Sequence, residues 1–203
     1  MKPVYLSTAY LAPTAYYSKL LSHHVVIEKY CHYVKQTYRN RCTIATTNGL
    51  LSLSIPIEKP ATAKVFTKDI RIASHGDWQH LHWNAMVSAY NSSPFFEYYA
   101  DDFRPFYEKK QTFLFDFNEA LRELICRLLD IEPVISYSET YLPEVENDFR
   151  ELIHPKKDYP ALDSAFVPKP YYQVFRQKYG FQPNLSIVDL LFNMGLEGVM
   201  VLG

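Results

Sequence analysis

Hydrophobic positions in the first quarter of the chain predict a buried strand followed by a hairpin. Residues 24–30 are rich in β-branched side chains and stay apolar at consecutive positions until Glu28, as in a strand covered on both faces. Residues 41–45 and 50–57 flank Asn48-Gly49, a turn dipeptide that accepts positive φ at both positions, so they are expected to pair antiparallel. Leucine or isoleucine alternates with serine in the second arm, which places one face of the hairpin on the core.

A helix is predicted from Trp78 to about residue 91, with Asp77 as its N-cap. Its polar residues recur at helical spacing and form one stripe: His80, Asn84, Ser88 and Asn91. His82 lies about 200° round the helix from His80, by the 3.6-residue turn, and so shares the apolar side with Trp78 and Met86.

Two more helices carry expected capping pairs. Asp116 and Glu119 stand ahead of an apolar pattern that is spaced for one buried face over about 15 residues. Ser186 and Asp189 repeat this arrangement before a short terminal helix, and Gly195 follows where a left-handed residue ends helices.

These elements predict a single α+β domain over residues 1–203, with a mixed sheet that contains antiparallel strands and is flanked by helices. The length of 203 residues suits one hydrophobic core, and no repeat or Gly/Ser-rich linker divides the chain. Four prolines between positions 155 and 170 block a regular helix, so this stretch is expected to be an ordered loop.

Charge and cysteine content narrow the functional classes. A formal net charge of -1 leaves no positive field for nucleic acid or an anionic membrane. No secretory signal or membrane-spanning run of about 20 apolar residues is recognisable, which favours a cytoplasmic location. Cys31, Cys42 and Cys126 lack paired spacing, so neither a disulfide framework nor a metal site nor any other cofactor is expected. His80 and His82, two apart on a helix, diverge and do not clamp one metal ion.

A cationic face is predicted between the first strand and the hairpin. Lys35, Arg39 and Arg41 occupy odd positions, which point to one side of an extended chain. Guanidinium forks match phosphate or carboxylate oxygens in pairs, so a nucleotide diphosphate would fit. The alternative is a solvated edge strand whose charges oppose aggregation.

Acid–base candidates also have two interpretations. Glu28 is either a general base, with its pKa raised by burial, or one partner of a structural ion pair with arginines. His82 is either a proton shuttle or a hydrogen-bonded core residue. Asp148 and Arg150 alternate around Phe149 and line a cleft or form a surface pair. The 17 tyrosines and 13 phenylalanines suit either half-wet cleft walls or a core built with tyrosine.

Five stretches together resemble the WbqC-like protein family. In chain order they are residues 35–42 (Lys-Gln-Thr-Tyr-Arg-Asn-Arg-Cys), the Asn48-Gly49 hairpin, Trp78 with His82 and Trp83, Tyr90 with residues 93–96 (Ser-Pro-Phe-Phe) and Tyr98, and residues 184–193 (Asn-Leu-Ser-Ile-Val-Asp-Leu-Leu-Phe-Asn). The resemblance runs nearly end to end, and its first and last stretches are the most specific.

The resemblance implies a role in O-antigen or other surface-polysaccharide biosynthesis, and a glycine transferase role is suggested for family members. The family's polar positions fall here on Glu28, Lys35, Arg39, Asn40, Arg41, His82, Tyr90, Ser186 and Asp189. Residues 7–13 (Ser-Thr-Ala-Tyr-Leu-Ala-Pro) depart from the usual opening of Gln-Pro leading to Tyr-Leu-Pro-Trp. A glycine-rich segment of the family also has no counterpart between Pro155 and Pro170. The substrate is therefore the property in which this chain is most expected to differ from other family members.

The resulting hypothesis is an enzyme that transfers an acyl or aminoacyl group to an amino sugar held as a nucleotide sugar. In it, Lys35, Arg39 and Arg41 neutralise the diphosphate. Trp83 and Tyr90 cover the sugar, and Glu28 or His82 takes the amine proton. The rival hypothesis is a non-catalytic module that binds a glycan, a nucleotide or a protein; the sequence defines no oligomeric state for either.

Overall fold

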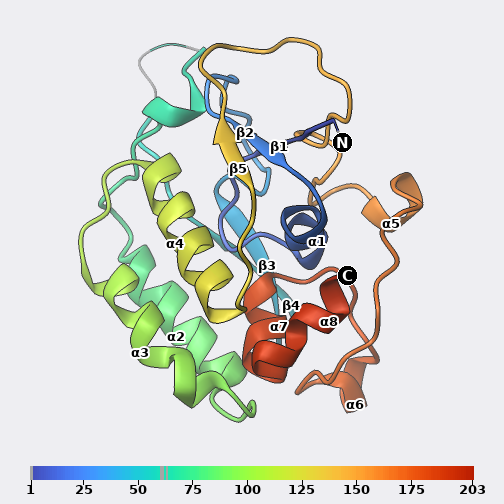
Figure 1. The fold of residues 1–203 in the computed structure, drawn as a ribbon. Helices are drawn as coiled ribbons and strands as arrows, with labels where there is room; N and C mark the ends of the chain where they lie inside the picture. Colours follow the sequence, from blue (N-terminus) through green and yellow to red (C-terminus); the bar gives the residue numbers. More distant parts are fainter. Residues whose placement is uncertain (1, 60–61, 63) are drawn as a thin grey trace.

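The computed structural model describes residues 2–59, 62 and 64–203, and within that part of the chain it combines helices with two small sheets (Figure 1). The first sheet is parallel, in the order β1 (Val4–Ser7), β2 (Val25–Glu28) and β5 (Ile135–Tyr137). Helix α1 (Thr14–Ser22) connects β1 to β2, as parallel neighbours require a crossover. The strand predicted within residues 24–30 is confirmed as β2.

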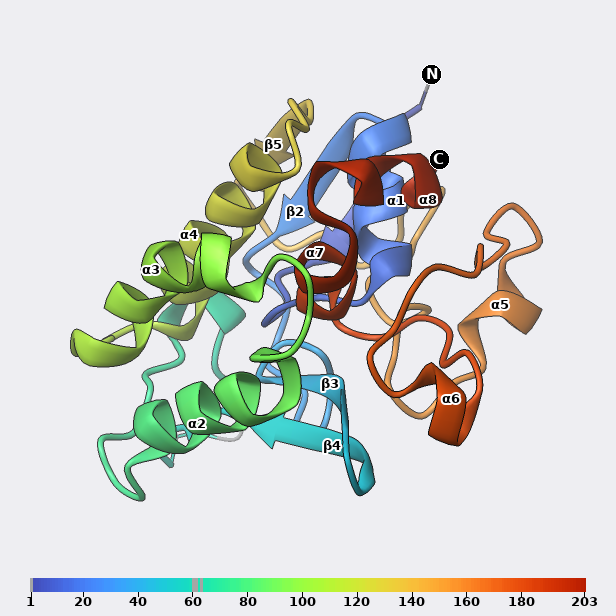
Figure 2. The same ribbon diagram turned by 90° about the horizontal axis from the view of Figure 1, so that it is seen from below.

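The second sheet is the predicted hairpin of β3 (Arg41–Thr46) and β4 (Gly49–Ser54), paired antiparallel around Asn48. Gly49 has a φ of 102°, the positive value that the turn dipeptide was expected to supply. Leu53 is buried on the core, but Leu51 is 39% exposed. The alternation in the second arm therefore holds only near its C-terminal end, because the turn end of the hairpin extends beyond the helices (Figure 2).

The other regular elements of the described chain are helices. Their bounds are α2 (Trp78–Tyr90), α3 (Phe96–Glu108), α4 (Leu114–Leu128), α5 (Tyr159–Leu162), α6 (Arg176–Tyr179), α7 (Ile187–Met194) and α8 (Val199–Leu202), with 3-10 turns η1 (Thr67–Asp69) and η2 (Gly195–Gly198). The three predicted helices are confirmed as α2, α4 and α7. The stretch 155–170 is not wholly a loop, since α5 lies within it.

The predicted side-chain caps are wrong, although the helices begin close to where they were expected. Asp116 lies inside the first turn of α4, whose N-cap position is Phe113. Ser186 and Asp77 occupy N-cap positions, but neither side chain bonds its helix. Glu119 instead accepts from Thr8, from Tyr137 of β5 and from Arg122 one turn further along α4, because a buried carboxylate finds stronger donors there than a helix terminus offers.

The elements pack round one hydrophobic core, which gives an α+β fold. Helices α7 and α8 lie against α1, and α2 lies along the hairpin (Figure 2). The predicted combination of parallel and antiparallel strands is present, but it is divided between two separate sheets, one parallel and one antiparallel. Among the described residues, no helix has the length and apolar character that crossing a bilayer requires.

Candidate functional site

Polar side chains gather where the three parallel strands end. Ser7 closes β1, Glu28 closes β2 and pairs with Ser7 in register, and Ser138 follows β5. Ligands of parallel sheets bind at the carboxyl ends of the strands, where connecting loops converge. The carboxyl-edge site consists of the residues that meet there: Ser7, Glu28, Cys31, Arg39, Ser138, Arg150 and Glu151.

Glu28 is completely buried and accepts four hydrogen bonds. Its Oε1 accepts from the Tyr30 backbone N–H and the Ser138 hydroxyl, both at 2.8 Å. Its Oε2 accepts from the Leu142 backbone N–H at 3.1 Å and from Arg150 Nη1 at 3.3 Å. Since a carboxylate offers about four lone-pair positions, all of them are used. The geometry favours an anchoring role for Glu28 over that of a proton acceptor.

Arg150 extends this anchor to a second carboxylate. Its Nη2 and Nε lie 2.6 and 2.9 Å from the two carboxylate oxygens of Asp148, and its Nη1 donates to the Leu142 carbonyl at 2.5 Å. Hydrogen bonds from Arg150 hold the pKa of Asp148 below its ordinary value. The loop that follows β5 is thereby fastened to the end of β2.

Arg39 is the second arginine of the site, beside Arg150, and is only 2% exposed. Its Nη2 donates to Ser7 Oγ at 2.7 Å and Glu151 Oε1 at 2.6 Å, and it lies 3.7 Å from Cys31 Sγ. Its Nη1 reaches Thr37 Oγ1 at 3.3 Å. Within the described part of the chain, its Nε has no hydrogen-bond partner. A buried donor without an acceptor is rare in proteins and points to an oxygen that a water or ligand supplies.

A small cavity of about 10 Å³ lies between Arg39, Tyr16 and the loop after β1. Tyr16 is 3% exposed, and its hydroxyl also lacks a partner among the described residues. Such a space holds about one water molecule. The cavity is therefore suited to one water or one ligand oxygen, and the body of a larger ligand has to lie outside it.

Exposed aromatic rings stand beside the carboxyl edge. His32 stacks on Phe66, with ring centroids 5.6 Å apart and planes at 4°, and lies 5.8 Å from Tyr141. Tyr30 meets the other side of Phe66 at 5.7 Å. These four residues, named here the aromatic platform, come from the loops after β2 and β5 and from the residue before η1; Tyr30 is half-buried and the other three are exposed. Sugar faces and nucleobases stack on such rings.

Basic groups surround the platform and Arg39. Lys29 and Lys68 lie over the Tyr30 ring, at 5.6 and 5.4 Å from its centroid. His154 is half-buried, and its pKa is lowered, mainly by burial and also by the positive charges of Lys157, Lys156 and Arg39 against that of Glu151. Its Nδ1 accepts the backbone N–H of Lys156 at 3.1 Å.

The predicted cationic face does not form, because residues 35–40 turn instead of extending. Gln36 has a φ of 61°, which reverses the chain after the exposed Lys35. Arg41 begins β3, and Asn40 braces the hairpin by donating from Nδ2 to the Ile55 carbonyl at 2.9 Å. Arg39 alone of the three predicted cations enters the carboxyl-edge site.

His82 lies on the buried face of α2 and is 5% exposed. Its Nδ1 is 2.9 Å from the hydroxyl of Tyr10, which in turn lies 2.8 Å from that of Tyr107. Burial lowers the pKa of His82 to about 4. Trp83 packs on Tyr107 and Phe96 in the same layer, so neither residue joins the carboxyl-edge site through the contacts described.

The remaining predicted residues form a second buried network. Asp189 accepts from Tyr90 at 2.9 Å, Tyr171 at 2.7 Å and the side chain of Gln173 at 3.0 Å. Burial raises the pKa of Asp189 against the opposing effect of these donors. Ser186 donates to the Leu11 carbonyl at 2.7 Å. These contacts tie α7 to the rest of the fold.

The structure thus unites Glu28 and Arg39 and separates them from the other predicted residues. Sequence reasoning missed Ser7, Tyr16 and Ser138, which carry no recognisable spacing. The alternation of Asp148 with Arg150 was the one signal for the anchoring loop. In the described part of the chain, no three His, Cys, Asp or Glu side chains cluster as a metal site would require.

Comparison with known proteins gives a family but no activity. The model of the WbqC-like protein family matches residues 9–161, which include Glu28, Arg39 and Arg150. Rv1507c, an uncharacterized protein of Mycobacterium tuberculosis, is 27% identical over 193 residues, and the match covers 81% of each chain. No solved structure is significantly similar. The chain belongs to the WbqC-like protein family.

Proposed function

We propose that the carboxyl-edge site binds a nucleotide sugar and that the protein transfers an acyl or aminoacyl group, glycine being one candidate, to an amine of that sugar. Surface-polysaccharide biosynthesis in the cytoplasm is the setting in which such a reaction belongs. The observation that carries the proposal is the buried, partly unpartnered Arg39 at the ends of parallel strands, next to exposed stacked rings.

In this proposal each group has one task. The Nε of Arg39 and the Tyr16 hydroxyl receive a phosphate oxygen in the small cavity, and the charge of Arg39 is worth more there because the site is buried. The aromatic platform covers the base or the sugar. Glu28 and Arg150 hold the surrounding loop, while Asn40, Tyr90, Ser186 and Asp189 hold the scaffold.

The contacts in the structure change which residue is assigned as the proton acceptor. Glu28 has no vacant lone pair, and His82 is enclosed in the core. His154 is half-buried, the charges of Arg39 and Glu151 act on it, and its Nδ1 accepts the backbone N–H of Lys156 at 3.1 Å. It is the better candidate because this single exposed hydrogen bond is all that has to open before Nδ1 takes a proton. The amine nitrogen attacks the acyl carbon, the bond to the donor's leaving group breaks with its electron pair, and the imidazole takes the amine proton.

The test is a search for an acylated sugar. The protein is incubated with a diphosphate-linked 4-amino sugar and, in separate reactions, with acyl thioester and aminoacyl ester donors, and products are followed by mass spectrometry. We expect a mass increase of one acyl group. Tyr141→Ala should raise KM about tenfold through loss of stacking. Tyr98→Ala is the matched control, because this tyrosine is 78% exposed on α3. Absence of product with every donor rejects the transferase.

A non-catalytic binding module is the second candidate, and the saturated hydrogen bonding of Glu28 favours it. Nucleotide sugars then raise the melting temperature in proportion to occupancy, without turnover. Binding that is weakened by Tyr141→Ala, with no product from any donor, supports this candidate. Product formation rejects it.

A further inference from the structure

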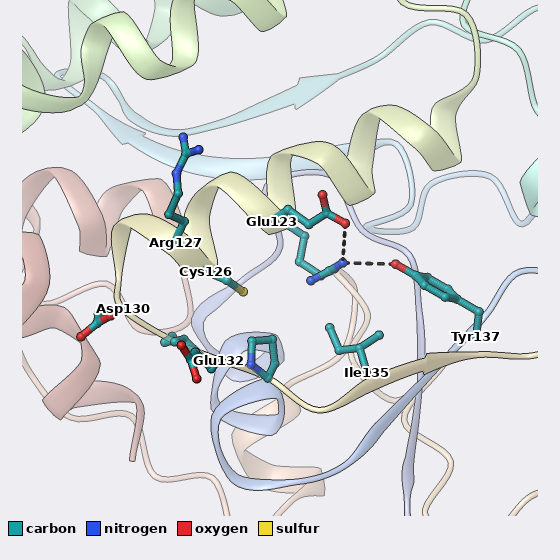
Figure 3. A pocket seen from close by; sticks show the side chains of 10 residues that line it. Glu123, Cys126, Arg127, Asp130, Glu132, Ile135 and Tyr137 are labelled. Carbon is teal, nitrogen blue, oxygen red and sulfur yellow. Dashed lines mark hydrogen bonds and ion pairs between the residues drawn. The ribbon is translucent and has the colours of Figure 1, made fainter.

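A groove of about 540 Å³ runs between α4 and β5 (Figure 3). Its α4 wall includes Arg122 and Cys126, which are both buried, and Ile135 and Tyr137 point toward α4 from the opposite wall. The volume lies in the range of ligand-binding clefts, roughly 300–1,000 Å³. Nothing in the proposed function uses this groove.

The strand that walls the groove has an open edge. Hydrogen bonds to β2 bracket β5, from Val25 N to the Val134 carbonyl at 2.9 Å and from Ser138 N to the Ile27 carbonyl at 3.1 Å. Parallel pairing uses alternate residues, so the groups of Ser136 face β2 and those of its two neighbours face away.

The outward groups are the backbone N–H and C=O of Ile135 and Tyr137. In the part of the chain that the structure describes, these four groups have no hydrogen-bond partner. The other edge of the same sheet is different. Tyr5 of β1 accepts from Phe149 N at 2.9 Å and donates to the Asn147 carbonyl at 3.1 Å. The chain therefore covers one edge of the sheet with its own backbone and leaves the edge beside the groove open.

The rim of the groove is acidic. Asp130 and Glu132 are exposed and pair with no cation among the described residues. Arg122 is held by Glu119 at 2.9 Å and also serves Glu123 at 3.5 Å. The other arginine of the groove, Arg127, contacts Asp102 at 3.6 Å. The arginines of the groove are thus already paired, and a ligand with positive charge would complement Asp130 and Glu132.

We propose that an extended, lysine- or arginine-bearing peptide segment of a partner protein adds to β5 as a fourth strand. Main-chain hydrogen bonds to Ile135 and Tyr137 supply affinity, as in other cases of strand addition. Alternate side chains of the added strand enter the groove beneath α4, where the basic ones meet Asp130 and Glu132. Proteins usually protect exposed strand edges from pairing with other chains. An edge that stays uncovered beside an acidic groove is therefore suited to serve as an interface.

The first test uses a synthetic probe and the full chain. A six-residue acetylated peptide that alternates valine and lysine is titrated while the backbone amide signals of Ile135 and Tyr137 are followed by NMR. We expect both signals to shift. N-methylation of the three alternate residues that face β5 should weaken binding at least tenfold, whereas N-methylation of the other three should not. No shift at millimolar peptide, or equal effects of the two N-methylated peptides, overturns the proposal without any protein variant.

The second test concerns charge. Asp130→Lys combined with Glu132→Lys should weaken the lysine peptide about tenfold, and Glu139→Lys, an exposed change outside the groove, should leave it unchanged. Circular dichroism confirms that the variants fold. Unchanged affinity in the double variant overturns the proposal. Concentration-dependent dimerisation that blocks the peptide also overturns it, because the edge then belongs to a second copy of the chain.

Discussion

Arg150 places its Nη1 3.3 Å from Oε2 of Glu28, although 122 residues separate the two in the chain. The carboxylate is completely buried and the arginine side chain is 7% exposed. A buried charge pair of this kind holds its position firmly when other hydrogen bonds complete it, and here they do. The pair fastens the loop after β5 to the strand whose end forms the candidate site.

Removing the negative charge of Glu28 should therefore unfold the protein more easily. In Glu28→Gln an amide group replaces one acceptor oxygen and faces donors, and Arg150 keeps Asp148 as its only carboxylate partner. We expect a loss of about 3 kcal/mol in the free energy of unfolding. Urea denaturation measures it. Glu146→Gln, at a carboxylate that is 66% exposed, is the control and should change stability by less than about 0.5 kcal/mol.

His82 should make stability depend on pH. Its folded pKa of about 4 lies below the ordinary value of 6.5, so between these values the unfolded chain binds a proton that the folded chain does not. Stability is fully present above pH 6.5 and falls on acidification toward pH 4, by about 3 kcal/mol in total. Thermal unfolding over this range should show a weaker pH dependence in His82→Gln. His80→Gln, on the exposed face of α2, should keep the slope of the parent; equal slopes in all three proteins contradict the prediction.

Two tyrosines should respond in opposite ways to loss of the hydroxyl. Tyr10→Phe removes partners from His82 and Tyr107 and should destabilise the fold by about 1–2 kcal/mol. Tyr16→Phe removes a hydroxyl without a partner in the described residues, so stability should stay the same or rise. Nucleotide binding should weaken only in Tyr16→Phe. The idea fails if Tyr16→Phe is the more destabilised variant.

Gly195 should tolerate no side chain. Its φ is 59°, and an added Cβ lies 2.9 Å from the ring of Phe95. Gly76 also has a positive φ, of 80°, but has no atom within 4 Å of such a Cβ. Both alanine variants carry backbone strain of about 1 kcal/mol, and Gly195→Ala should lose a further 1–3 kcal/mol from the clash. Differential scanning calorimetry compares them, and equal losses contradict the clash.

Periodic elements and the unbroken β-branched run of β2 were predictable from sequence, whereas the other short or fully buried elements were not. The hairpin, α2, α4 and α7 carry alternation or a 3.6-residue stripe. Helix α1 is buried at seven of its nine positions, so no polar stripe marks it. Strands β1 and β5 have four and three residues, too few for a period, and Pro105 interrupts the pattern of α3.

The candidate site was predictable only in part, for a similar reason. Glu28 is conspicuous because it is a charged residue in an apolar strand, and its ion-pair interpretation agrees with the contacts. Lys35 and Arg41 were placed beside Arg39 on the assumption of an extended chain, and the left-handed backbone at Gln36 removes that assumption. The charged partners of Glu28 and Arg39 are Arg150 and Glu151, which lie more than 100 positions away, beyond the reach of spacing arguments.

The closure of β1 by residues 147–149 also has a consequence during synthesis on the ribosome. Ser7 reaches Arg150 across 143 positions, so the first strand emerges long before the backbone that covers its edge. Long-range pairings of this kind form late and slowly. We expect the nascent chain to hold the backbone N–H and C=O of Tyr5 unpaired until translation has passed residue 150, which makes the β1 segment a binding target for ribosome-associated chaperones.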